Sequence, residues 1–158
     1  MKIWIAGFGN IDRQDDGAGI ILASLIAEWL NNKQENDVKL SLEHQLLPEL
    51  AEELNNVDLA IFVDADMRQH ENGWDIAVVD PNPRIEGLNI HSMGPAWLVQ
   101  LSRQLGTPPK RALTLSVSGS SFDFSDRVTS ECEAHIRAAE KAFQEWYEKQ
   151  FDGKIARS

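Results

Sequence analysis

Hydrophobic and polar positions follow two different periods along the chain. Short apolar runs bounded by glycine or aspartate predict strands, and apolar residues that recur every three or four positions predict helices. Residues 2–6 form an apolar run that ends at a glycine, and residues 58–63 form a nearly continuous apolar run that ends at Asp64. Runs of this kind are typical of strands that are covered on both faces of a sheet.

Read in this way, the chain alternates between strands and helices. Strands are expected at residues 2–6, 38–42, 58–63, 75–79 and 112–117, and helices at residues 16–30, 95–105 and 130–150, with a short one that begins at Pro48. The fourth strand is expected to form a hairpin with the third, and Ser130 and Glu133 are expected to form a capping box. The pattern predicts an α/β fold, a three-layer α/β/α sandwich around a central, mostly parallel twisted sheet of about five strands. A single domain is expected over residues 1–158, with a flexible tail at about 151–158.

Composition and charge narrow the class of protein. The chain has 158 residues, of which 42% are hydrophobic and 25% charged, the usual mix of a globular protein. Its formal net charge of −10 argues against a nucleic-acid partner. No apolar run approaches the roughly 20 residues of a membrane span. The single cysteine, Cys132, fits a reducing compartment. We therefore expect a cytoplasmic protein without a membrane or nucleic-acid partner, and we expect a monomer.

The stretch IAGFGNIDRQDDGAG, residues 5–19, joins the first strand to the first helix. Glycine-rich turns in this position often bind phosphate at the helix N-terminus. Here the dinucleotide fingerprint has Asp12 where it requires a third glycine, and the lysine of a P-loop is missing. Asp15 and Asp16 occupy the helix start themselves, so a second anion there would be repelled. The loop is better suited to holding carboxylates, with Asp15 expected to cap the helix and Asp16 left for another role.

Two further glycines, Gly17 and Gly19, lie in the first turn of this predicted helix. Each lowers helix stability by about 1 kcal/mol relative to alanine. The sequence therefore predicts that something approaches the backbone closely at this point.

Several polar side chains follow the predicted strands, where the sites of α/β folds form. Asp64 and Asp66 come at the end of the third strand, His44 follows the second, and His91 precedes the third helix. Each also has an ordinary structural interpretation, as a loop cap or a hydrogen-bonded histidine. Together, Asp16, Asp64 and His91 make a set of two carboxylates and one imidazole, which suits a divalent ion such as Zn²⁺ or Ni²⁺.

Other kinds of catalytic site fit the sequence less well. Ser120 and Ser121 lack the pattern of a nucleophile elbow. Cys132 lies on the apolar stripe of the last predicted helix, where core packing is its expected role.

Three motifs in this order resemble one known family. GFGNIDRQDDGAG, VDLAIFVDA and HSMGPAWLV are similar to motifs of the [NiFe]-hydrogenase maturation proteases, and the resemblance covers nearly the whole chain. It implies a metal-dependent, aspartic-type endopeptidase that removes the C-terminal extension of the hydrogenase large-subunit precursor. The nickel is already bound in the precursor, and the protease reads it as a recognition point. A departure is EHQLLPELAEEL, which stands where many members have a glycine-rich segment.

The resemblance also assigns residues. It implies that Asp16, Asp64 and His91 contact the nickel and that Asp16 or Asp64 acts as general base. The supporting loop residues it implies are Gly7, Gly9, Asn10, Asp15, Gly17 and Gly19. The roles of His44 and Asp66 stay open.

Two other functions remain open at this point. The opening MKIWIAGFGN is also similar to that of peptidyl-tRNA hydrolases, although the chain departs from them at Ile11 and Asp12 and its net charge disfavours tRNA. The same ligands would also serve a non-catalytic nickel-binding or chaperone module.

Overall fold

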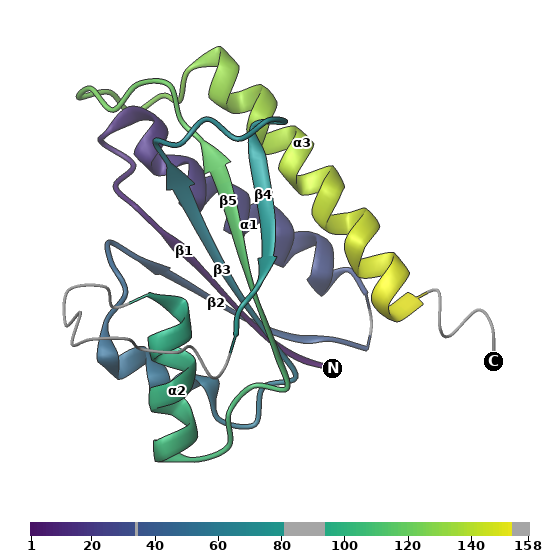
Figure 1. The fold of residues 1–158 in the computed structure, drawn as a ribbon. Helices are drawn as coiled ribbons and strands as arrows, with labels where there is room; N and C mark the ends of the chain where they lie inside the picture. Colours follow the sequence, from purple (N-terminus) through teal and green to yellow (C-terminus); the bar gives the residue numbers. More distant parts are fainter. Residues whose placement is uncertain (34, 81–93, 153–158) are drawn as a thin grey trace.

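A five-stranded sheet forms the centre of the computed structural model, which describes residues 1–33, 35–80 and 94–152 (Figure 1). The strands are β1 (Lys2–Phe8), β2 (Asp37–Glu43), β3 (Leu59–Asp66), β4 (Trp74–Val78) and β5 (Arg111–Ser118). Their order across the sheet is β2-β1-β3-β5-β4, and all neighbours are parallel except β4 and β5. The prediction of a mostly parallel sheet of about five strands is confirmed.

Helices cover both faces of this sheet. Helices α1 (Ala18–Asn31) and α3 (Ser130–Tyr147) lie on one face, and α2 (Pro95–Leu105) lies on the other with the 3₁₀ helix η2 (Pro48–Leu54) (Figure 1). Side chains along β1 point alternately to the two faces of the sheet. Ile3 and Ile5 pack toward α1, and Trp4 packs toward η2. The three-layer architecture is therefore as predicted. Among the described residues, we find no helix that is both long and apolar enough to span a bilayer.

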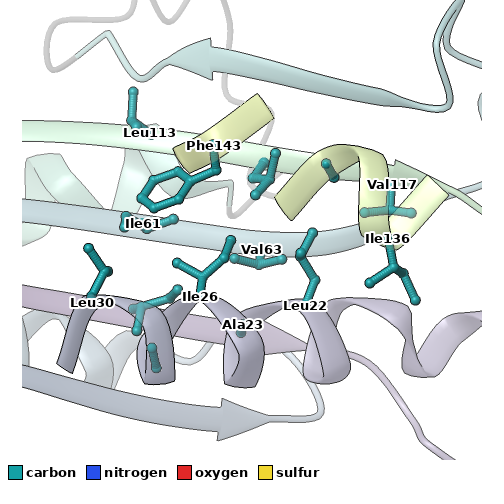
Figure 2. Packing of buried hydrophobic residues seen from close by; sticks show 14 of the residues in the cluster. Leu22, Ala23, Ile26, Leu30, Ile61, Val63, Leu113, Val117, Ile136 and Phe143 are labelled. Atoms are coloured by element: carbon teal, nitrogen blue, oxygen red, sulfur yellow. The ribbon is translucent and has the colours of Figure 1, made fainter. Parts of the chain in front are cut away.

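The core between the sheet and the layer formed by α1 and α3 is built mainly from aliphatic side chains, with the aromatic rings of Phe143 and Tyr147. Figure 2 shows Leu22 and Ile26 of α1 beneath Val63 of β3, and Phe143 of α3 beside Ile61 and Leu113. All of these side chains are almost fully buried. This packing fixes α1, and with it the loop that precedes α1, against the ends of the strands.

The partner of β4 differs from the prediction. The strand does not form a hairpin with β3 but pairs in an antiparallel manner with β5, from Trp74 opposite Val117 to Val78 opposite Leu113. Both edges of β3 are already occupied, by β1 and by β5. Since a strand has only two edges, β4 is left to pair with the outer edge of β5.

The helix ends also differ in detail. The expected helix over residues 16–30 begins with a short 3₁₀ turn, Gln14–Gly17, and the segment that begins at Pro48 is 3₁₀ rather than α-helical. The capping box expected at Ser130 is replaced by Thr129, whose hydroxyl accepts a hydrogen bond from the Cys132 N–H at 3.2 Å. At the other end, α3 stops at Tyr147 and continues as a π-helical turn.

Residue 151, where the flexible tail was predicted to begin, packs against α3. Phe151 packs against Trp146 and Tyr147, with ring centroids 5.9 and 4.9 Å away, so residue 151 belongs to the folded body. The rest of the predicted tail, residues 153–158, lies outside the described residues.

Candidate active site

Glycines in and beside the β1–α1 loop allow backbone segments of the chain to pack closely against one another. Gly9 has a φ of +141°, and a Cβ there would overlap the Asp16 carbonyl. A Cβ on Gly19 would lie 2.9 Å from the Val63 carbonyl oxygen and 3.0 Å from the Asp64 Cα. The first turn of α1 therefore lies directly against the end of β3. The close approach predicted from Gly17 and Gly19 exists, and the neighbour is the protein's own backbone.

Asp15 does not cap its own helix, contrary to the prediction. Its buried carboxylate accepts hydrogen bonds from the backbone N–H groups of Ser120, Ser121 and Thr129 at 2.7–3.0 Å, and from the Thr129 hydroxyl at 2.8 Å. Burial alone would raise the pKa of this carboxyl, but the four hydrogen bonds outweigh burial and hold the pKa below its ordinary value. Asp15 thus fastens the β1–α1 loop to the loop that precedes α3.

Asp16 has a different environment from its neighbour. Its carboxylate accepts a hydrogen bond from the Asn10 N–H at 2.8 Å and is partly open to solvent. It lies in the wall of a cavity of about 480 Å³ at the carboxyl ends of β1 and β3. The cavity is lined by Phe8, Gly9, Asp16, His44, Gln45, Leu46, Phe62, Asp64, Gly94, Pro95, Thr114 and Ser116. Asp16 therefore presents a carboxylate to a space that a ligand can enter.

Asp64 reaches the same cavity from β3. It is open to solvent on the cavity side, but the protein that surrounds it elsewhere removes part of its hydration. This desolvation, together with the negative charges of Asp16 and Asp66, raises its pKa to about 6, although the Ala65 N–H offers partial compensation. A carboxyl with such a pKa can take up and release a proton near neutral pH.

The remaining candidate residues lie in different places. His44 lines the cavity with an exposed side chain. Asp66 is engaged in its own loop, where its carboxylate accepts a hydrogen bond from the Arg68 N–H at 2.8 Å and lies 3.2 Å from His70 Nε2. His91 lies outside the described residues, so its predicted place beside Asp16 and Asp64 stays a prediction.

The other loop residues named above support this arrangement. Gly7 lies against Ala23 of α1, and Gly17 lies against Ile11. Asn10 orients Asp16 through its N–H group and also accepts a hydrogen bond from the Asp12 N–H at 2.9 Å. Cys132 is fully buried, and desolvation raises the pKa of its thiol to about 12, which agrees with a role in packing.

The side chains in the cavity wall could supply some, but not all, of the ligands of a metal-binding site. In residues 1–33, 35–80 and 94–152, no three His, Cys, Asp or Glu side chains gather closely enough to hold an ion. The two carboxylates in the cavity wall would supply part of a coordination sphere and leave positions for ligands from elsewhere.

Two polar side chains of the cavity were missed by the sequence reasoning. Thr114 and Ser116 come from β5 and lie beside Asp64, which is opposite Ser116 in the sheet. The signal that could have found them is their alternation with buried Leu113, Leu115 and Val117 in a central strand. Polar residues on one face of such a strand indicate that hydrophobic core side chains do not cover this face.

Several solved structures with the same fold are named as hydrogenase maturation endopeptidases. HybD from E. coli superposes with a TM-score of 0.67 at 21% identity, over 96% of this chain and 94% of that one. The hydrogenase 2 maturation peptidase from Thaumarchaeota archaeon SCGC_AB-539-E09 gives 0.64 at 18% identity, over 92% and 97%. The protease HycI from Thermococcus kodakarensis KOD1 gives 0.62 at 21% identity, over 89% of each chain. No protein-family model and no curated protein matches the sequence.

The chain is therefore an α/β protein with an acidic cavity at the carboxyl edge of its sheet. More narrowly, its fold is that of the hydrogenase maturation endopeptidases, shared along nearly the whole length of both chains.

Proposed function

We propose that the chain is an endopeptidase of hydrogenase maturation, which removes the C-terminal extension of a nickel-loaded [NiFe]-hydrogenase large-subunit precursor. One observation carries the proposal: Asp16 and Asp64, from separate segments, both line a single open cavity. The likeness in fold to proteins named as maturation endopeptidases supports the same reaction class.

The two carboxylates suit the tasks that this reaction sets. Nickel enters as part of the substrate, and carboxylate oxygens are suitable ligands for a divalent ion. Asp16 is held in place by the Asn10 N–H, so its orientation is fixed before the substrate arrives. Nickel bound there would polarise the scissile carbonyl or acidify a water molecule. Asp64, whose pKa is raised to about 6, can accept the proton of the attacking water.

The cavity also suits a peptide segment. Phe8 and Phe62 give it an apolar wall, and Thr114 and Ser116 give it polar groups that can bond to a peptide backbone. A space of about 480 Å³ is in the range of sites that hold small ligands and admits a few residues of an extended chain. His91 is proposed as the third nickel-contacting residue on the resemblance alone.

The test is incubation of the purified protein with the precursor, with and without nickel, followed by intact-mass analysis. We expect loss of a C-terminal peptide only from the nickel-loaded precursor. Asp16→Asn and Asp64→Asn should stop the cleavage, because each removes a charged oxygen ligand while keeping the shape of the side chain. Asp37→Asn is a matched control, since Asp37 is exposed at the start of β2 and far from the cavity.

The outcomes separate the possible functions. Cleavage of the nickel-free precursor would refute the nickel requirement, and normal cleavage by both active-site variants would refute the site. Tight nickel binding by the isolated protein with no cleavage would instead indicate the non-catalytic nickel-binding module.

A further inference from the structure

Three loops at the carboxyl edge of the sheet are hydrogen-bonded into one surface, here called the loop platform: residues 9–14, 66–70 and 119–126. The Gln14 N–H donates to the Ser125 carbonyl at 2.9 Å, and the Ser125 N–H donates to the Asp12 carbonyl at 3.1 Å. The Gly119 N–H donates to the Asp66 carbonyl at 2.9 Å, which joins the third loop to the second. Loops that follow β1, β3 and β5 in this way hold one another in place (Figure 1).

Each loop of the platform exposes one large apolar side chain. Ile11 is 56% exposed, Met67 76% and Phe124 85%. Single exposed apolar residues are common on protein surfaces and need no explanation. Three of them lie on loops that are hydrogen-bonded to one another, at the edge of the sheet that carries the cavity, and this makes the surface a candidate for contact with another molecule.

The exposed side chain of Phe124 is restrained by its neighbours. The guanidinium carbon of Arg13 lies 4.5 Å from the centre of its ring, a cation–π contact that restrains the side chain. The loop that carries Phe124 is fastened by the four hydrogen bonds to buried Asp15. These contacts reduce the conformational entropy that the ring and its loop would lose on binding. Aromatic residues presented in this way commonly dominate the binding energy of protein interfaces.

The charges of the platform indicate the chemistry of the partner. The three loops together carry four acidic side chains, Asp12, Asp66, Asp123 and Asp126, and two arginines, Arg13 and Arg68. The formal net charge of the chain is −10. A complementary partner therefore has an apolar pocket bordered by Lys and Arg, because opposite charges at the rim favour association.

The platform adjoins the candidate active site. Asp16, in the cavity wall, comes two residues after the first loop, and Asp64 precedes Met67 by three residues. A protein seated on the platform would thus have part of its surface beside the cavity.

We propose that the loop platform docks the folded body of the precursor, with Phe124 inserted into an apolar pocket that is bordered by basic side chains. This inference rests on the proposed function for the identity of the partner. It implies that recognition has two parts, a contact with the folded body on the platform and a contact with the scissile segment in the cavity.

The test compares binding and cleavage of the nickel-loaded precursor by wild type and Phe124→Ala. We expect Phe124→Ala to weaken binding, measured by biolayer interferometry, by at least about tenfold, and to raise KM in proportion while kcat stays similar. Met67→Ala should have a smaller effect in the same direction. Leu105→Ala is the matched control, because Leu105 is 57% exposed at the end of α2, near the opposite edge of the sheet, and should leave both quantities unchanged.

The outcomes distinguish this inference from the proposed function. Cleavage with an unchanged KM and Kd in Phe124→Ala would overturn the docking surface and leave the peptidase intact. Weaker binding by Phe124→Ala, without cleavage by either protein, would support docking and overturn the peptidase. No binding of the precursor by wild type would overturn both. Self-association of wild type in sedimentation experiments that is lost in Phe124→Ala would overturn the inference in favour of a second copy of this chain.

Discussion

Replacing Asp15 by alanine should destabilise the whole protein, although the residue lies beside the candidate active site. Its buried carboxylate accepts four hydrogen bonds from Ser120, Ser121 and Thr129. The alanine variant would leave three backbone N–H groups and one hydroxyl without their acceptor. The loop before α3 and the loop before α1 would then lose four of the hydrogen bonds that connect them.

The size of the effect follows from these contacts. A hydrogen bond to a charged group contributes about 1.5–3 kcal/mol, but the four share one acceptor and are not additive. Ser120 is exposed and its N–H can find water, whereas Thr129 is only partly accessible. We expect the free energy of unfolding to fall by about 3 kcal/mol. For a chain of this length, that corresponds to a fall in Tm of roughly 6–12 °C.

Thermal unfolding followed by circular dichroism, at several pH values, measures both the size and the cause. The folded state holds the pKa of Asp15 below its unfolded value of 3.8, so the carboxylate stabilises the protein above that pH and loses its effect as the pH falls further. The difference in Tm between wild type and Asp15→Ala should therefore be full at neutral pH and shrink in acid below about pH 4.

Asp12→Ala is the control for this experiment, because Asp12 lies in the same loop with an exposed side chain. It should change the free energy of unfolding by less than about 0.5 kcal/mol. If Asp15→Ala melts within about 2 °C of wild type at neutral pH, the connection through Asp15 is not what holds the two loops together.

Three further results are expected. Gly9→Ala should lower the free energy of unfolding by more than about 2 kcal/mol, because φ is +141° and the new methyl overlaps the Asp16 carbonyl; melting like wild type would contradict this. The pKa of Asp64, about 6, lies above its unfolded value of 3.8, so stability falls as the pH rises between the two. At about pH 7.5, Asp64→Asn should therefore be more stable than wild type by ~1 kcal/mol after solvent screening. At about pH 4 it should show no gain, and an equal gain at both pH values would refute the reasoning. Cys132, buried and with a pKa raised to about 12, should react with thiol reagents only after denaturation, and rapid labelling of the native protein would show otherwise.

The elements of the fold could be predicted wherever their signals are local. The bounds of α2 match the prediction because Pro95 stands at its first position and Gly106 follows its last. The partner of β4 could not be predicted, because it depends on β5, which comes more than thirty residues later and takes the free edge of β3. The end of β3 was placed too early for a related reason: Asp64 and Asp66 end the apolar pattern, yet their backbones still pair with Ser116 and Ser118.

The candidate site, like the fold, could be predicted only where its signals are local. The strand-end rule directed attention to Asp16 and Asp64, and both line one cavity, while their roles as ligand or base stay predictions. The role of Asp15 was missed because its hydrogen-bond partners lie more than one hundred positions away. No local pattern distinguishes a residue that caps its own helix from one that fastens a distant loop.

The two adjacent aspartates show how this glycine-rich loop differs from a phosphate-binding loop. They lie in a 3₁₀ turn, where consecutive side chains diverge by about 120°, so Asp15 turns into the protein and Asp16 turns toward the cavity. A phosphate site needs free N–H groups at the helix start, but here the Asp15 N–H donates to the Ser121 carbonyl and the Asp16 N–H to the Arg13 carbonyl. The donors that would hold an anion are thus engaged with the protein's own backbone. What the loop offers to the cavity is the carboxylate of Asp16, which can attract a cation.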